Sequence, residues 1–151
     1  MGSRVFITSD HNGNAARAYL CRLLTRLGYE PVDLGPDYDT KVDYIDYAKK
    51  LCDNIYEESL QGFKPARGIL ICGTGTGMCI AANRYSWIRA GLATDRATAE
   101  LMRQHNDANV LVLGQWRTPL GQMDELVQTF LETPFEEGRH IPRVEKLGRL
   151  P

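Results

Sequence analysis

Gly68-Ile69-Leu70-Ile71-Cys72-Gly73-Thr74-Gly75-Thr76-Gly77 is the stretch that decides the fold class of this 151-residue chain. The apolar run at 68–71 is typical of a short buried strand, and the alternating glycines after Cys72 predict a tight turn into a helix that starts at about Met78. A strand that turns directly into a helix is half of a βαβ unit, and such units build parallel sheets. The segment therefore predicts an α/β protein.

The same alternation continues on both sides of this segment. We expect strands at Arg4–Ser9, Glu30–Leu34, Gly68–Ile71, Arg89–Ala93 and Asn109–Leu113. Helical apolar patterns cover 13–27, 44–55, 78 onward, 95–104 and 118–130. This order predicts one doubly wound, Rossmann-like domain over residues 1–151, with a five-stranded parallel sheet and helices on both faces. The polar, basic tail from Thr133 is expected to form a packed C-terminal helical arm.

The composition excludes several classes of function. With 18 Lys and Arg against 19 Asp and Glu, the net charge of −1 gives no electrostatic basis for binding nucleic acid or an anionic membrane. No apolar run is long enough to cross a bilayer, and the N-terminus has no signal-peptide core. The four cysteines form no C-x-x-C pair and do not group with the three histidines as zinc ligands would. We therefore expect reduced thiols, a cytoplasmic location and no metal.

The glycine turn has two interpretations. Its backbone amides and the N-terminus of the following helix could converge on an anion, or it could be a sharp turn without a ligand. It is neither a P-loop, which needs G-K-[ST], nor the dinucleotide fingerprint G-x-G-x-x-G. Cys72 could likewise be an inert core residue or a thiolate favoured by those amides. Cys21, Cys52 and Cys79 fall on helical patterns and are expected to be inert.

Other polar groups stand where predicted elements end. Asp10-His11 follows the first strand, at the edge of the sheet where parallel α/β proteins bind ligands. His105-Asn106 follows the fourth helix, either as a functional pair or as an ordinary polar helix end. Arg139 and Arg143 are one helical turn apart and could grip a phosphate, although a basic tail is also common as solvated surface.

Taken in order, these pieces resemble the ribose-5-phosphate isomerase B and galactose-6-phosphate isomerase family. The matching motifs are S-D-H-N-G at 9–13, V-D-Y at 42–44, G-I-L-I-C-G-T-G-T-G at 68–77, I-A-A-N-R at 80–84, R-Q-H-N-D-A-N-V-L at 103–111 and E-G-R-H-I-P-R-V-E at 137–145. The resemblance implies the doubly wound fold and the isomerisation of a sugar phosphate without metal or cofactor. It also implies a homodimer with shared active sites, and leaves open whether dimers pair into tetramers.

The resemblance further implies a role for each matching residue. The catalytic group would be Cys72, Thr74, His105 and Asp10. Cys72 would move a proton between C1 and C2 of the open-chain sugar, while Thr74 and the amides of Gly73, Gly75, Thr76 and Gly77 stabilise the cis-enediolate. His105 of the neighbouring subunit would open the furanose ring. Asp10 and Tyr44 would contact sugar hydroxyls, His11, Arg139 and Arg143 would bind the phosphate, and Asn106 would line the site.

Departures from the family pattern leave the sugar open. Trp116 stands where the family often has a phosphate-binding arginine, with Arg117 one step further on, and Ala97 replaces a common tyrosine. Another branch has a glutamate base at the position of Met78, so only Cys72 can fill that role here. We therefore expect ribose 5-phosphate as substrate, with galactose 6-phosphate or allose 6-phosphate as the nearest alternative. A non-catalytic nucleotide-binding module is a more distant one.

Overall fold

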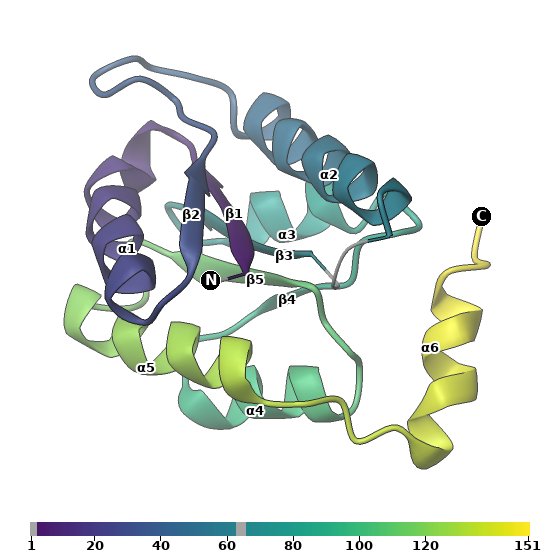
Figure 1. Ribbon diagram of the computed structural model, residues 1–151. Coiled ribbons are helices and arrows are strands. Elements are labelled where there is room, and N and C mark those ends of the chain that lie inside the picture. Colours follow the sequence, from purple (N-terminus) through teal and green to yellow (C-terminus); the bar gives the residue numbers. More distant parts are fainter. Residues whose placement is uncertain (1–2, 63–65) are drawn as a thin grey trace.

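The computed structural model describes residues 3–62 and 66–151 and contains one parallel sheet. Its strands are β1 (Arg4–Ser9), β2 (Glu30–Asp33), β3 (Arg67–Cys72), β4 (Ala90–Leu92) and β5 (Val110–Gly114). They lie in the order β2-β1-β3-β5-β4, and every neighbouring pair is parallel (Figure 1). The chain winds outward from β1 to β2, then returns to β3 on the other side of β1. This confirms the predicted doubly wound sheet.

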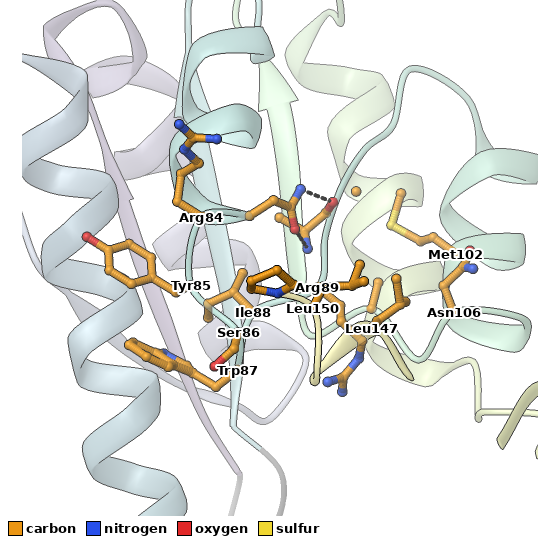
Figure 2. Close-up of a pocket in the computed structure, with 15 residues that line it drawn as sticks. Arg84, Tyr85, Ser86, Trp87, Ile88, Arg89, Met102, Asn106, Leu147 and Leu150 are labelled. Atoms are coloured by element: carbon orange, nitrogen blue, oxygen red, sulfur yellow. Dashed lines mark hydrogen bonds between the residues drawn. The ribbon is translucent and has the colours of Figure 1, made fainter. Parts of the chain in front are cut away.

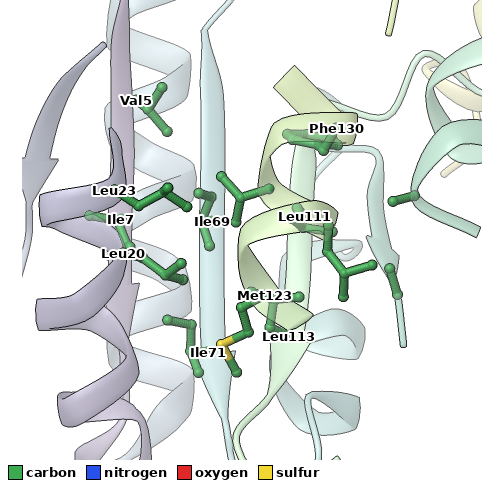
Figure 3. Close-up of a cluster of buried hydrophobic side chains, with 14 of the residues drawn as sticks. Val5, Ile7, Leu20, Leu23, Ile69, Ile71, Leu111, Leu113, Met123 and Phe130 are labelled. Atoms are coloured by element: carbon green, nitrogen blue, oxygen red, sulfur yellow. The ribbon is translucent and has the colours of Figure 1, made fainter. Parts of the chain in front are cut away.

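Helices cover both faces of the sheet. One face carries α1 (Asn14–Arg26), α4 (Arg96–Gln104) and α5 (Leu120–Glu132), and the other carries α2 (Tyr44–Leu60) and α3 (Thr76–Ala82). Successive strand residues point to opposite faces, so the sheet fills two cores. Figure 3 shows the first, in which Ile7, Ile69, Leu111 and Leu113 meet Leu20, Leu23, Met123 and Phe130. In the second, Phe6, Leu70 and Val112 meet Leu51, Ile55 and Met78.

Local chemistry sets the ends of several elements. Asp43 and Asp95 cap α2 and α4, and their carboxylates accept from the N–H groups of Ile45 (2.9 Å) and Thr98 (2.8 Å). Helix α3 begins at Thr76, two residues before its predicted start, because Gly75 turns the chain at a φ of +84°. Strand β3 extends one residue beyond its predicted end. Cys72 is therefore fixed in the sheet ladder.

The segment after α5 leaves the sheet. A 3₁₀ turn at Gly138–His140 leads into α6 (Ile141–Leu147), which stands apart from the other helices in Figure 1. No residue of α6 is buried. The helical arm is therefore present as predicted, but its helix is not packed into the body of its own chain. Among the described residues, no helix is both long and apolar enough to cross a membrane.

Candidate active site

The candidate site lies at the carboxyl edge of the sheet, where β1, β3 and β5 end side by side. Backbone hydrogen bonds join the three following loops. The N–H of Asp10 donates to Ile71 O (3.1 Å), that of Gln115 to Cys72 O (2.8 Å) and that of Trp116 to Gly73 O (2.8 Å). The side chains that leave these three strands therefore have fixed backbone positions relative to one another.

Cys72 is the last residue of β3 and is only 5% exposed. It packs in the second core beside Leu70, Met78 and Val112. The loop that follows it is tightly confined: a β-carbon at Gly73 would come within 2.7 Å of the Trp116 ring, and one at Gly75 within 2.5 Å of Leu92. Close packing therefore requires glycine at both positions directly after Cys72 and Thr74.

An aromatic ring lies at each end of the glycine loop. Trp116 packs against Gly73, and Tyr44 packs against Gly77, where a β-carbon would meet its ring at 2.6 Å. Between them, Thr74 Oγ1 accepts a hydrogen bond from the N–H of Thr76 (3.2 Å). The loop therefore has two aromatic walls and a polar centre, a combination typical of sites for small polar molecules.

Asp10 and His11 occupy the neighbouring loop. Asp10 is 7% exposed, and its carboxylate accepts from the backbone N–H of Asn12 (2.9 Å) and from Asn12 Nδ2 (3.2 Å). His11 Nδ1 accepts from the N–H of Val42 (3.2 Å). Because Nδ1 accepts, the neutral ring carries its proton on Nε2, which is then a donor. The structure thus brings Asp10, His11, Cys72 and Tyr44 to one edge of the sheet.

Sequence reasoning missed Arg17, a buried residue of α1 that fixes this edge. Its guanidinium donates to Ser9 Oγ (2.6 Å), to Asn14 Oδ1 (2.9 Å) and to Pro36 O, and its Nε lies 3.0 Å from the Asp33 carboxylate. It therefore ties the end of β1 to the loop that leads to α2. The sequence shows only an arginine within an amphipathic helix, and an arginine at such a position usually lies on the solvent-exposed face.

The other predicted site residues lie elsewhere in the same chain. Helix α4 runs back from the carboxyl end of β4, and the chain then enters β5 at Val110. His105, the C-cap of α4, and Asn106 therefore lie at the amino edge of the sheet. Arg139 and Arg143 lie on the arm, and neither makes an ion pair with another described residue. A single chain does not bring these residues to Cys72.

His140 is a second residue that sequence reasoning did not single out. Its ring stacks on that of His105, with centroids 4.5 Å apart and an interplanar angle of 15°. Its position directly after Arg139 could have suggested a place in the same site, but the tertiary fold was needed to pair it with His105. The structure therefore groups His105 and His140 in one polar cluster at the base of the arm.

A cavity separate from the glycine loop lies between the arm and the body of the chain. It has a volume of about 660 Å³ and lies at the amino edge, between the end of the arm and the segment 83–91 (Figure 2). Leu147 and Leu150 line it from the arm, Trp87 and Ile88 from the body. Asn106 is the one predicted site residue in its wall. It offers an apolar surface and contains none of the cysteines.

The other three thiols have raised pKa values. Burial raises the pKa of Cys21 to about 11 and that of Cys52 to about 12, and Asp33 and Asp53 respectively add to these shifts. Burial also raises the pKa of Cys79. These three thiols are therefore protonated near neutral pH, and a thiolate nucleophile or base is not expected at any of them. This agrees with their predicted inert character.

Comparison with known proteins identifies the family. The model of the family described as Ribose/Galactose Isomerase matches residues 5–147. The chain belongs to this family. It is 39% identical over 150 residues to the "probable ribose-5-phosphate isomerase B" of Mycoplasma genitalium, covering 99% of this chain and 96% of that one. It is 36% identical over 138 residues to ribose-5-phosphate isomerase B of Escherichia coli, covering 91% and 89%.

Solved structures agree with this assignment. The crystal structure of the Mycoplasma genitalium ribose-5-phosphate isomerase B with bound ribulose-5-phosphate superposes with a TM-score of 0.91 at 38% identity, and the alignment covers 99% of this chain and 96% of that one. The ribose 5-phosphate isomerase of Thermotoga maritima gives a TM-score of 0.92 at 39% identity, covering 99% and 100%. The family resemblance and the fold predicted from the sequence are both confirmed.

Proposed function

We propose that this protein is an aldose–ketose isomerase that interconverts ribose 5-phosphate and ribulose 5-phosphate, with Cys72 as its base. The observation that carries the proposal is the position of Cys72, which ends the central strand at the head of a glycine loop with polar and aromatic neighbours. Two relatives over nearly the whole chain are named for this reaction, and one holds ribulose-5-phosphate. The site and the family therefore support the same chemistry.

The reaction is a proton transfer between adjacent carbons. After ring opening, the Cys72 thiolate removes the proton from C2 of the aldose, and the carbonyl oxygen at C1 becomes the oxyanion of a cis-enediolate. The proton then returns to C1 while the hydroxyl proton of O2 passes to O1, so that a carbonyl forms at C2 and a hydroxyl at C1. Thr74 and the amides of the glycine loop stabilise the oxyanion in the transition state. Because only protons move, this chemistry draws on no redox cofactor.

The substrate has two ends to hold. Asp10 and Tyr44 flank the loop and contact sugar hydroxyls in this proposal. His11, which is oriented by the N–H of Val42, presents Nε2 to the phosphate. Arg139 and Arg143, which make no ion pair with other described residues, supply the positive charge that a doubly ionised phosphate needs. Asn106 lines the site beside His105.

The complete site requires two chains. In one chain Cys72 and His105 lie at opposite edges of the sheet, because α4 runs antiparallel to the strands and returns the chain to their amino ends. A two-fold dimer would bring the carboxyl edge of each chain to the amino edge and arm of its partner. Exposed apolar residues border the part of the site that contains Cys72. Ile45 and Ile80 line a cleft there with Tyr44 and Gly77. His105 of the partner then opens the sugar ring.

The choice of sugar rests on Trp116. Its indole packs on Gly73 beside the catalytic loop, where the family often has a phosphate-binding arginine. The aromatic ring can cover the carbon chain of a sugar, and this observation keeps a six-carbon phosphate such as allose 6-phosphate or galactose 6-phosphate as the second candidate.

The cellular location follows from the cysteines. Free thiols at all four cysteines suit the cytoplasm, where we place the enzyme.

A panel of aldose phosphates tests the proposal. Pure protein is incubated with ribose, galactose and allose phosphates, and ketose formation is measured. We expect the highest kcat/KM on ribose 5-phosphate. Turnover of a six-carbon phosphate alone would favour the second candidate. If no sugar phosphate reacts but NAD raises the melting temperature in a thermal-shift assay, the chain is instead a nucleotide-binding module.

A further inference from the structure

Two imidazoles and a carboxylate meet at the base of the arm. The rings of His105 and His140 are stacked at 4.5 Å, and Glu136 Oε1 lies 3.5 Å from His140 Nε2. One possible ligand atom from each of the three residues lies within 4.8 Å of the other two. The sequence predicts no metal site, because His105 and His140 are far apart along the chain, and only the fold brings them together with Glu136.

His140 carries an unsatisfied polar atom in this cluster. The residue is 5% exposed, and its Nε2 makes no hydrogen bond with any part of the chain that the structure describes. Buried polar atoms without a partner cost free energy, so each one calls for an explanation. Nε2 lies 3.5 Å from Glu136 Oε1, close to the separation of about 3.3 Å between two ligand atoms of a tetrahedral zinc site. A bound cation between them would satisfy both groups.

The backbone around the three residues is anchored. The N–H of Glu136 donates to Gln104 O (3.0 Å), which places Glu136 beside the helix end that carries His105. Arg103, only 3% exposed, donates through Nε to Thr133 O (3.1 Å) and holds the start of the tail on α4. The cluster is therefore fixed by main-chain contacts, and only side-chain rotations separate its present arrangement from a coordinating one.

We propose that His105, Glu136 and His140 form a binding site for a divalent transition metal of the zinc type, and that its occupation inhibits the enzyme. Two imidazoles and one carboxylate are ligands that suit Zn²⁺, Co²⁺ or Ni²⁺ and not Mg²⁺ or Ca²⁺. Tetrahedral zinc ligands lie about 3.3 Å apart, so the atoms must approach from their present spread of up to 4.8 Å. His105 is partly buried and Glu136 is exposed, so both can rotate toward the buried His140.

Inhibition follows from the loss of the His105 lone pair. An imidazole nitrogen that coordinates a metal can neither accept nor relay a proton, and it cannot then open the ring of the substrate. This consequence rests on the proposed function, in which His105 acts on the partner's substrate. Metal binding itself rests only on the geometry of the three side chains.

Cobalt absorption tests the site independently of activity. The full-length protein, treated with a chelator and then freed of it, is titrated with Co²⁺ while the visible d–d bands are recorded, and Zn²⁺ is added in competition. We expect one Co²⁺ to bind per chain and to be displaced by Zn²⁺. Its d–d absorption bands should have the high intensity of four- or five-coordinate cobalt. Glu136→Gln should weaken binding by roughly tenfold or more. Glu136 is exposed, so this change leaves the fold intact.

Glu137→Gln is the matched control, because it makes the same chemical change one residue outside the cluster and should bind Co²⁺ like the wild type. In a parallel isomerase assay, Zn²⁺ should inhibit the wild type and Glu137→Gln at low concentration and Glu136→Gln only at higher concentration. A sulfur-to-cobalt charge-transfer band with unchanged affinity in Glu136→Gln would place the metal on a cysteine and overturn the site. Absence of any bands would also overturn it. If the protein lacks isomerase activity, the cobalt titration still decides the matter.

Discussion

The indole of Trp116 lies directly on the α-carbon of Gly73, so that a β-carbon at this glycine would come within 2.7 to 2.9 Å of three ring atoms. The same two residues are joined by the hydrogen bond from the N–H of Trp116 to Gly73 O (2.8 Å). The loop after β5 is therefore packed on and hydrogen-bonded to the loop after β3. Any change in one of them is expected to affect the site that both form.

Gly73→Ala should disrupt this packing. The added methyl group must displace the indole, and overpacking of this kind costs about 1–3 kcal/mol. We expect a lower free energy of unfolding and a lower kcat/KM, measured by urea denaturation and by ketose formation. Adding Trp116→Ala removes the obstructing ring and should restore much of the lost stability. If the double variant is as unstable as Gly73→Ala alone, contact with the Trp116 ring is not the reason why position 73 requires glycine.

Trp116→Ala should change the preference between five- and six-carbon substrates, since the ring borders the loop that holds the sugar. Arg117→Ala should have little effect, because Arg117 lies one residue further along the chain than Trp116, and a shift of one residue changes the direction of a side chain. The measurement is kcat/KM of both variants on ribose 5-phosphate and allose 6-phosphate. A large rise in KM for Arg117→Ala on both sugars would instead indicate that Arg117 contacts the phosphate.

Cys72→Ala should abolish isomerisation while the fold and the binding of phosphate ligands persist. General bases contribute about 10²–10⁴ to the rate, so kcat is expected to fall by at least that factor. Iodoacetamide near neutral pH should inactivate the wild type by labelling Cys72, since the raised pKa values of Cys21 and Cys52, about 11 and about 12, keep them protonated. Peptide mapping checks this. Inactivation that follows labelling of Cys79 would contradict it.

Mixed dimers test whether sites are shared. Cys72→Ala and His105→Ala homodimers should both be inactive, but a mixed dimer has one site with both groups intact. After full subunit exchange of equal amounts, activity should recover to about a quarter of the wild-type value. Exchange is followed separately with a charge-tagged subunit and native gels. No recovery despite proven exchange would place His105 outside the partner's site.

Arg139→Ala and Arg143→Ala should raise KM with a smaller effect on kcat. A hydrogen bond to a charged group contributes about 1.5–3 kcal/mol, so each loss should weaken apparent affinity by roughly ten- to a hundredfold. Arg149→Ala is a suitable control, because Arg149 lies near the end of the chain and pairs with Glu145 at 3.6 Å. Unchanged KM in both tail variants would remove the arm from the phosphate site.

Most of the fold could be predicted because its signals are local. The apolar run before Cys72, the glycines after it and the cap at Asp95 depend on residues within a few positions of one another. The predicted ends of helices and strands were less accurate than their predicted order. The start of α3 at Thr76 depends on the positive φ of Gly75, where a β-carbon would also meet Leu92 and the end of β5. That contact is not visible in a local pattern.

The site divides in the same way. The side chains that end the strands can be read from the amino-acid sequence, because strand direction carries Asp10 and Cys72 to the same edge of a parallel sheet. The folded chain was needed to see that Trp116 packs on Gly73, that Arg17 joins β1 to the loop before α2, and that His140 stacks on His105. These pairs bring together residues from different elements. Their contacts depend on how helices and loops settle on the sheet, and this is set by packing of the whole core rather than by any one segment.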